Sequence, residues 1–132
     1  MTLDHVGIVV ESIDAVLPFY RDQLGLVVAH REEVASQKVR VAFLKDAADD
    51  RAQVELLEPM GDDGAVAKFL KNRGPGAHHV AFHAVDIASA MTRLKQAGRP
   101  PLEDSPRPGA RGHRVCFIHP KNAHGVLVEL VG

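Results

Sequence analysis

The chain has 132 residues, 45% of them hydrophobic and 25% charged, a composition typical of one globular domain with a substantial core. Its formal net charge of −1 argues against the basic surface of a nucleic-acid-binding protein. No apolar run reaches the length of a membrane span, so we expect neither nucleic acid nor membrane as a partner. The single cysteine, Cys116, excludes an internal disulfide and favours a cytoplasmic location.

The first half of the chain reads as a strand, a helix and three further strands. Alternating apolar residues predict a strand over 3–10, and Ser12 is a good N-cap for the helix that follows. Apolar residues at helical spacing continue to Leu24, and Gly25 ends this helix. Three strand-like runs then follow, at about 26–34, 38–45 and 52–58.

The second half repeats this order after a short predicted helix at about 64–73. A strand at 77–85 precedes Asp86, which is the expected N-cap of a helix that ends at Gly98. Weaker strand signals follow near 102–105 and 113–118, and a clear one at 125–131. The proline-rich segment 100–112 is predicted to be a loop at the mouth of a site.

An internal repeat with an offset of 74 positions relates the two halves. At this offset His5 and Glu55 match His79 and Glu129, and apolar strand and helix positions match as well. A repeat of this length indicates two copies of one supersecondary unit. The predicted fold class is therefore α+β, with two βαβββ modules pairing into a curved mixed β-sheet that encloses a metal-containing cleft, helices outside.

We expect the repeat to form a single domain over 1–132. Its predicted parts are module 1 at about 1–62, a linker helix at about 64–76 and module 2 at about 77–132.

The four repeated polar residues are candidate metal ligands. Strand periodicity places them on one face of the sheet, with the even-numbered aliphatic residues on the opposite face, under the helices. A carboxylate in the middle of a buried strand is costly without a positive charge beside it. Two imidazoles and two carboxylates predict one divalent metal ion, and the ligands leave Co²⁺, Mn²⁺, Ni²⁺, Zn²⁺ and Mg²⁺ open. The predicted metal ligands are His5, Glu55, His79 and Glu129.

Several segments match the pattern of a known family, among them LDHVGIVV (3–10), ELLEP (55–59), GAHHVAF (76–82) and HPKNAHGVLVEL (119–130). With them the chain resembles the vicinal-oxygen-chelate superfamily, which includes glyoxalase I and the extradiol dioxygenases, and within it the methylmalonyl-CoA epimerases. The resemblance places the same two His and two Glu on the metal ligands, and implies Co²⁺, an acyl-CoA substrate and a homodimer.

The resemblance implies an isomerase that interconverts (R)- and (S)-methylmalonyl-CoA, by proton removal and return at C2 through a metal-stabilised enolate. Glu129 is the candidate for one base. Some of these epimerases carry a second base, a Glu, on the third strand, where this chain has Val41. The second base is therefore left unidentified, with Glu55, a metal-bound water and another residue all open. Cations that would meet the CoA phosphates, or form solvated surface charge, are Lys71, Arg111 and Lys121.

Two other functions remain open at this point. The ligand set also suits a glyoxalase I-type lactoylglutathione lyase, although no glutathione-binding positions are evident. A non-catalytic ligand-binding module of the same fold is the other alternative, and Val41 is the feature in its favour.

Overall fold

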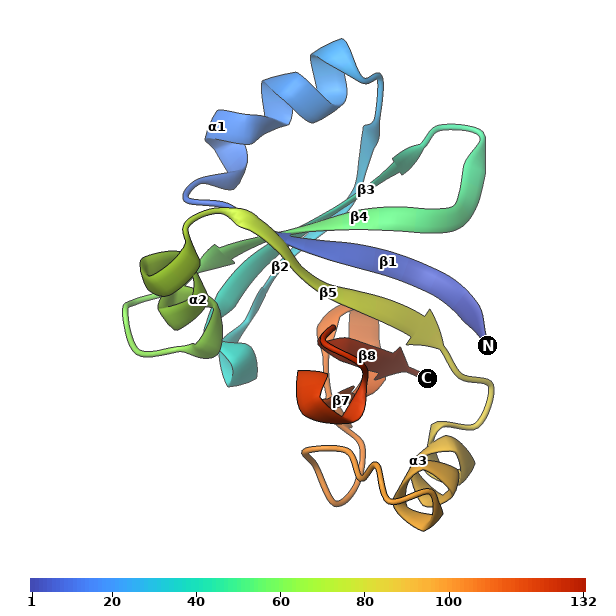
Figure 1. Cartoon of the computed structure of the whole chain (residues 1–132). Coiled ribbons are helices and arrows are strands. Elements are labelled where there is room, and N and C mark those ends of the chain that lie inside the picture. The colour runs from blue at the N-terminus through green and yellow to red at the C-terminus, as the bar shows by residue number, and fades with distance from the viewer. The chain divides into compact units, whose positions relative to one another are not determined.

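The computed structural model describes residues 1–132 and confirms the predicted α+β class (Figure 1). The chain forms two compact units, one from residues 5–78 and the other from residues 1–4 with 79–132. Neither unit holds a helix that is both long and apolar enough to cross a membrane.

The unit of residues 5–78 contains a four-stranded mixed sheet in the order β2-β3-β4-β1. Strand β1 runs parallel to β4, whereas β3 runs antiparallel to both β2 and β4. The strands are β1 (Thr2–Val9), β2 (Val27–Val34), β3 (Val39–Asp46) and β4 (Asp49–Pro59), and the helices are α1 (Ile13–Leu17) and α2 (Ala65–Arg73).

The other unit repeats this topology, with the strand order β5-β8-β7-β6. Strand β5 is parallel to β8, and β7 is antiparallel to β8 and β6. Both units are therefore βαβββ, as the repeat predicts. The elements are β5 (Gly76–His83), α3 (Ile87–Gln96), β6 (Arg107–Pro108), β7 (Arg114–Ile118) and β8 (Val128–Val131).

Three expected elements differ from the structure. The predicted strand near 102–105 is wrong: the strand that pairs here is the two-residue β6, because the surrounding prolines lack the amide donors that a ladder needs. The last strand begins at Val128 instead of 125, after a 3₁₀ turn at Pro120–Asn122. The first helix changes to a π-helical segment from Pro18, which cannot donate the next α-helical hydrogen bond.

The two predicted helix caps are confirmed. Ser12 Oγ accepts a hydrogen bond from the Ala15 amide at 3.3 Å, and Asp86 Oδ1 accepts one from the Ser89 amide at 3.0 Å. The hydroxyl and amide of Ser89 hold the pKa of Asp86 below its usual value. Each cap satisfies an amide that the first helical turn leaves without a partner, so each helix begins where the sequence indicates.

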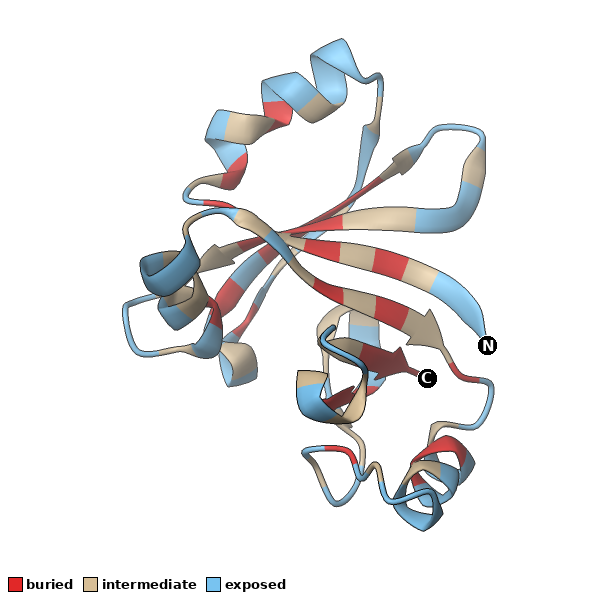
Figure 2. Ribbon diagram, in the orientation of Figure 1, coloured by how far each residue is buried: buried red, intermediate tan, exposed pale blue.

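One face of each sheet packs against its helix. In the unit of residues 5–78, Leu56 and Leu44 pack against Ile13 and Leu17 of α1. In the other unit, the corresponding cluster takes in Cys116 and Leu130 from the sheet and Ala90 and Met91 from α3. The even-numbered residues of β1 and β5 that face the helices, such as Ile8 and Phe82, are only partly buried. Figure 2 shows an alternation along both strands in which the buried positions are the odd-numbered ones, on the opposite face.

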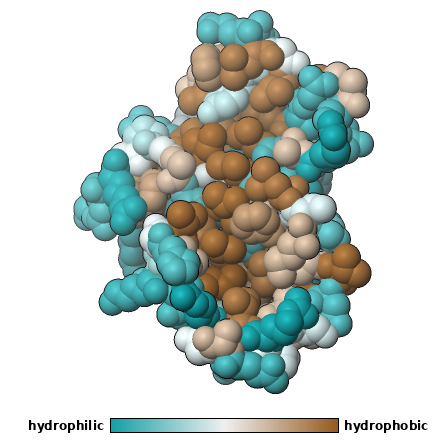
Figure 3. All heavy atoms as spheres, turned by 45° about the vertical axis from the view of Figure 1, so that its right-hand side comes forward, coloured by the Kyte–Doolittle hydropathy of each residue, from teal (hydrophilic) through white to brown (hydrophobic).

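Apolar residues also reach the surface. Figure 3 shows brown, apolar residues beside polar ones on the face that it draws. The large hydrophobic residues that are exposed include Met1, Leu3, Phe19, Leu24, Val85, Leu102 and Val126.

Replacing Leu56 with Ala should destabilise the protein by about 2–5 kcal/mol, because it leaves a cavity in a fully buried cluster. Urea unfolding followed by circular dichroism measures the change. Leu24→Ala is the matched control, since that side chain is 55% exposed and should change stability by less than about 0.5 kcal/mol. Equal effects of the two substitutions would contradict the packing described for this unit.

Candidate metal centre

The fold buries four polar residues, and they are the four predicted metal ligands. His5, Glu55, His79 and Glu129 are each at most 6% exposed. Two belong to each unit, so each unit supplies one imidazole and one carboxylate.

The first pair comes from the parallel strands β1 and β4. Their register sets Gly7 beside Glu55, with His5 two residues earlier on the same face of β1. His5 Nε2 lies 3.1 Å from Glu55 Oε2, and both side chains are almost completely shielded from solvent.

The second pair has the same construction on β5 and β8. Ala81 is the register partner of Glu129, and His79 again stands two residues before that partner. His79 Nε2 lies 3.1 Å from Glu129 Oε2. The sequence repeat is therefore reproduced in register and in the distance between the paired side chains.

One phenylalanine completes each pair, and sequence reasoning missed both of them. Phe43 is the register partner of Glu55, and its ring meets the His5 ring edge-to-face at 5.3 Å. In the other unit, Phe117 is the partner of Glu129 and meets His79 in the same way at 6.0 Å. Each ring packs against its imidazole, which is almost fully buried. The signal was available, because Phe43 and Phe117 are also 74 positions apart.

The small residues that lie beside the two carboxylates in the sheet were a second missed signal. Gly7 and Ala81 occupy equivalent repeat positions and are the direct neighbours of the two Glu. A large side chain there would fill the space in front of each carboxylate. The pattern His-x-small, repeated at the offset of 74, thus marks a strand that needs room on its ligand face.

The donor set fits a divalent cation. Each unit buries one carboxylate beside an imidazole among apolar side chains, and burying such a charge costs several kcal/mol unless it is neutralised. Two imidazole nitrogens and two carboxylate oxygens match the preferences of first-row divalent metals. The four side chains are accordingly candidate metal ligands.

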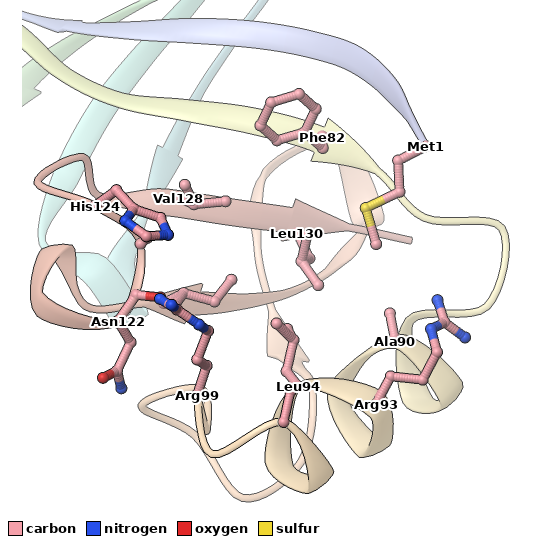
Figure 4. A pocket seen from close by; sticks show the side chains of 13 residues that line it. Met1, Phe82, Ala90, Arg93, Leu94, Arg99, Asn122, His124, Val128 and Leu130 are labelled. Carbon is pink, nitrogen blue, oxygen red and sulfur yellow. The ribbon is translucent and has the colours of Figure 1, made fainter.

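A separate cavity of about 520 Å³ lies in the unit that holds α3 (Figure 4). Its floor is formed by Phe82, Val128 and Leu130, which are on the helix side of the sheet. Glu129 projects from the opposite face, and none of the four candidate ligands lines this cavity. The cavity is therefore distinct from the candidate metal centre.

Arg111, one of the cations considered for CoA phosphates, is bound within the fold. Its Nη2 donates to Asp4 Oδ2 at 2.5 Å, and both side chains are largely buried. The backbone of Arg111 is left-handed, with φ of 57°, a conformation that costs a non-glycine residue energy. The ion pair offsets this cost and anchors the loop before β7 to the start of β1. Lys71 and Lys121 are exposed.

Cys116 is buried among apolar side chains, as expected of a small core residue. Burial raises the pKa of its thiol to about 12. The thiol stays protonated at neutral pH and plays no part in metal binding, since Cys116 belongs to the cluster under α3, on the other face of the sheet from His79 and Glu129.

Known proteins share this fold and much of the sequence. An ethylmalonyl-CoA/methylmalonyl-CoA epimerase of Cereibacter sphaeroides is 38% identical over 97% of this chain and 95% of its own length. The crystal structure of methylmalonyl-CoA epimerase from Mycobacterium tuberculosis matches 98% of this chain and 86% of its own, with 38% identity and a TM-score of 0.94.

A Streptomyces coelicolor methylmalonyl-CoA epimerase variant, solved with 2-nitronate-propionyl-CoA, matches 99% of this chain and 96% of its own, with 40% identity and a TM-score of 0.93. The family model described as Glyoxalase/Bleomycin resistance protein/Dioxygenase superfamily matches residues 4–117. The chain therefore belongs to the glyoxalase/bleomycin resistance protein/dioxygenase superfamily, which is the vicinal-oxygen-chelate superfamily that its sequence resembles.

Proposed function

We propose that this protein is a metal-dependent epimerase that interconverts (R)- and (S)-methylmalonyl-CoA. The observation that carries the proposal is the buried His–Glu pair in each unit, with the same register and the same 3.1 Å separation. Relatives named for this activity match nearly the whole chain, which supports the same substrate class.

We further propose that the two pairs together ligate one divalent cation, with Co²⁺ as the first candidate. The two imidazoles, two carboxylates and their burial support this assignment. When bound, such an ion supplies Lewis-acid stabilisation of the negative charge that develops on the thioester oxygen. The phenylalanine beside each imidazole packs against its ring.

The residues of the chain would move the proton. The C2 proton of the substrate is weakly acidic because its removal leaves an electron pair that the thioester carbonyl shares. Glu129 is the proposed base on one face of C2, since it holds a carboxylate in a buried site beside His79. Return of a proton to the opposite face inverts the centre.

The proposal is tested by following one epimer of methylmalonyl-CoA in D₂O, with metal-loaded protein and with protein treated with a chelator. Metal-dependent inversion with deuterium at C2 is the expected result. The glutathione hemithioacetal of methylglyoxal serves as the alternative substrate. Turnover of that compound alone would contradict the epimerase function and indicate a lyase. Tight binding of methylmalonyl-CoA without any proton exchange would indicate a binding module.

We also propose that the protein is a homodimer located in the cytoplasm. The exposed hydrophobic residues, among them Val85 and Phe19, support an interface with a second copy. Sedimentation equilibrium measures the mass directly.

A further inference from the structure

The cavity under α3 has no part in the proposed reaction. Its volume of about 520 Å³ lies within the range of about 300–1,000 Å³ that is typical of small-molecule sites. All of its lining residues belong to residues 1–4 and 79–132, so one unit forms the cavity completely. It lies on the helix side of the sheet, and the Glu129 side chain projects from the other side. A ligand could therefore bind here without touching the candidate metal ligands.

The interior of the cavity is apolar. Phe82, Val128 and Leu130 form its floor, and Ala90 and Leu94 of α3 form the wall that faces this floor in Figure 4. Phe82, Leu94 and Val128 pack against the core cluster but are only partly buried. Such side chains gain free energy when an apolar ligand covers them, because the ligand removes apolar surface from water.

One end of the cavity carries a guanidinium group that the fold holds in place. Arg99 Nη1 donates to the carbonyl oxygen of Asn122 at 2.7 Å, and the Arg99 amide donates to the carbonyl oxygen of Leu94 at 2.9 Å. Asn122 Nδ2 in turn donates to the carbonyl oxygen of Pro100 at 3.4 Å. A guanidinium group has several N–H donors, so the bond to Asn122 orients the group and leaves donors for a ligand.

The ionisable side chains that line the cavity are all basic. They are Arg93, Arg99 and His124, and no aspartate or glutamate lines the cavity. In Figure 4, Arg99 and His124 lie toward one end of the cavity and Arg93 toward the other. An anionic group beside Arg99 would gain charge-assisted hydrogen bonds, whereas a cationic ligand would be repelled. The charge of the lining therefore favours an anion.

The edge of the cavity favours a small molecule over a protein partner. Of the large hydrophobic residues that are exposed, only Met1 lines the cavity. The apolar surface is therefore recessed and bordered by polar side chains, as in pockets for small molecules. A stable interface with another protein would instead need an apolar surface that continues beyond the cavity.

The internal repeat is not kept at this cavity. At the offset of 74 positions, Tyr20 corresponds to Leu94 and Gly25 corresponds to Arg99. In the unit of residues 5–78, the larger Tyr20 side chain packs against the core cluster. The smaller side chain and the guanidinium group thus occur together in one unit and are both missing from its copy. A binding site that has been added to one unit would follow this pattern.

We propose that this cavity binds a carboxylate that carries an apolar chain, at a site separate from the candidate metal centre. The chain lies along Phe82, Leu94 and Val128, and the carboxylate accepts hydrogen bonds from Arg99. The site needs neither a metal ion nor the other unit. It goes beyond the proposed epimerase function and does not depend on it.

Isothermal titration calorimetry with straight-chain monocarboxylates from butanoate to decanoate tests the proposal. Each added CH₂ group should tighten binding about 3- to 4-fold until the chain fills the cavity. The primary alcohol of the same length should bind about 10- to 100-fold more weakly, because it lacks the charge-assisted hydrogen bonds. Treatment with a chelator should leave the affinity for each carboxylate unchanged.

Leu94→Tyr tests the place of the chain. This substitution introduces the side chain of the other unit, fills the cavity and should abolish binding of every member of the series. Leu94→Met is the matched control, because its similar volume leaves the cavity open and should preserve binding. Circular dichroism and the midpoint of thermal unfolding establish that both variants are folded.

Arg99→Gln tests the place of the carboxylate. It should weaken carboxylate binding about 10- to 100-fold and leave binding of the alcohol unchanged. Lys121→Gln is the control and should bind like the wild type, because Lys121 precedes Asn122 in the chain but does not line the cavity.

Several results would overturn the proposal. Wild-type affinity in both L94Y and R99Q would place the ligand elsewhere, and equal affinity for acid and alcohol would remove the carboxylate from recognition. Loss of binding on chelation, or competition by methylmalonyl-CoA, would place the ligand at the candidate metal centre. Absence of binding to the wild-type protein would exclude the site. In that case, a lower mass of L94Y in sedimentation equilibrium would assign the cavity to an interface between copies.

Discussion

Replacing Glu129 with Gln is expected to lower kcat for methylmalonyl-CoA inversion by at least about 10³-fold, the upper part of the range for loss of a general base. Gln retains an oxygen beside His79 but accepts no proton under these conditions. The substitution also removes one negative charge from the candidate metal ligands, which adds to the loss of activity. Chiral separation of the two epimers after a timed reaction measures the rate.

The repeat offers the control for this substitution. Glu55 stands beside His5 at the same distance and register as Glu129 beside His79. Glu55→Gln should weaken metal binding about as much as E129Q, but should reduce turnover at saturating metal far less. Equal reductions in kcat at full metal occupancy would show that Glu129 acts only as a ligand.

Addition of the native metal to metal-free protein is expected to raise the stability by about 2.7 kcal/mol when the free metal is at 100 times its Kd. For a chain of this length, the midpoint of thermal unfolding should rise by about 10 °C. The reason is that the ion binds only the folded protein and neutralises carboxylates that folding buries. Differential scanning calorimetry measures the midpoint. Repeating it with Co²⁺, Mn²⁺, Ni²⁺, Zn²⁺ and Mg²⁺ in turn would rank the metals by the rise in midpoint that each one causes.

His5→Ala and His79→Ala should each abolish this metal-dependent rise. His124→Asn is the control, because His124 is exposed and has a φ of 56°, which Asn tolerates. A full rise in either ligand variant would exclude the affected pair from the metal site. A loss confined to one pair would mean that a single unit binds the ion.

Much of the fold was predictable because its strongest signals are periodic and local. The apolar alternation of β1 and the caps Ser12 and Asp86 gave the element order, and the repeat gave the second βαβββ unit. The four buried polar residues were found because a mid-strand Glu is hard to explain twice at one offset. Their pairing as His–Glu within each unit followed from the parallel register of β1 with β4 and of β5 with β8.

The remainder depended on information that periodicity does not carry. The position of β6 is set by prolines that prevent pairing, and the π-helical segment follows from Pro18. Which residues of β2 share the face of Glu55 depended on the register of β2 on β3, because a bulge after Val28 shifts that strand. A one-residue change of register would exchange the two faces of the strand.

Each ligand pair is complete within one βαβββ unit, with its His, its Glu, its small neighbour and its phenylalanine. Each pair therefore keeps its own local geometry, whatever the outer strand of its unit carries. On the outer strands the repeat is not kept: His30 lies opposite Phe43 in one unit, and Arg107 lies opposite Val115 in the other. Two copies in one polypeptide can differ in this way, whereas two identical chains in a symmetric pair cannot.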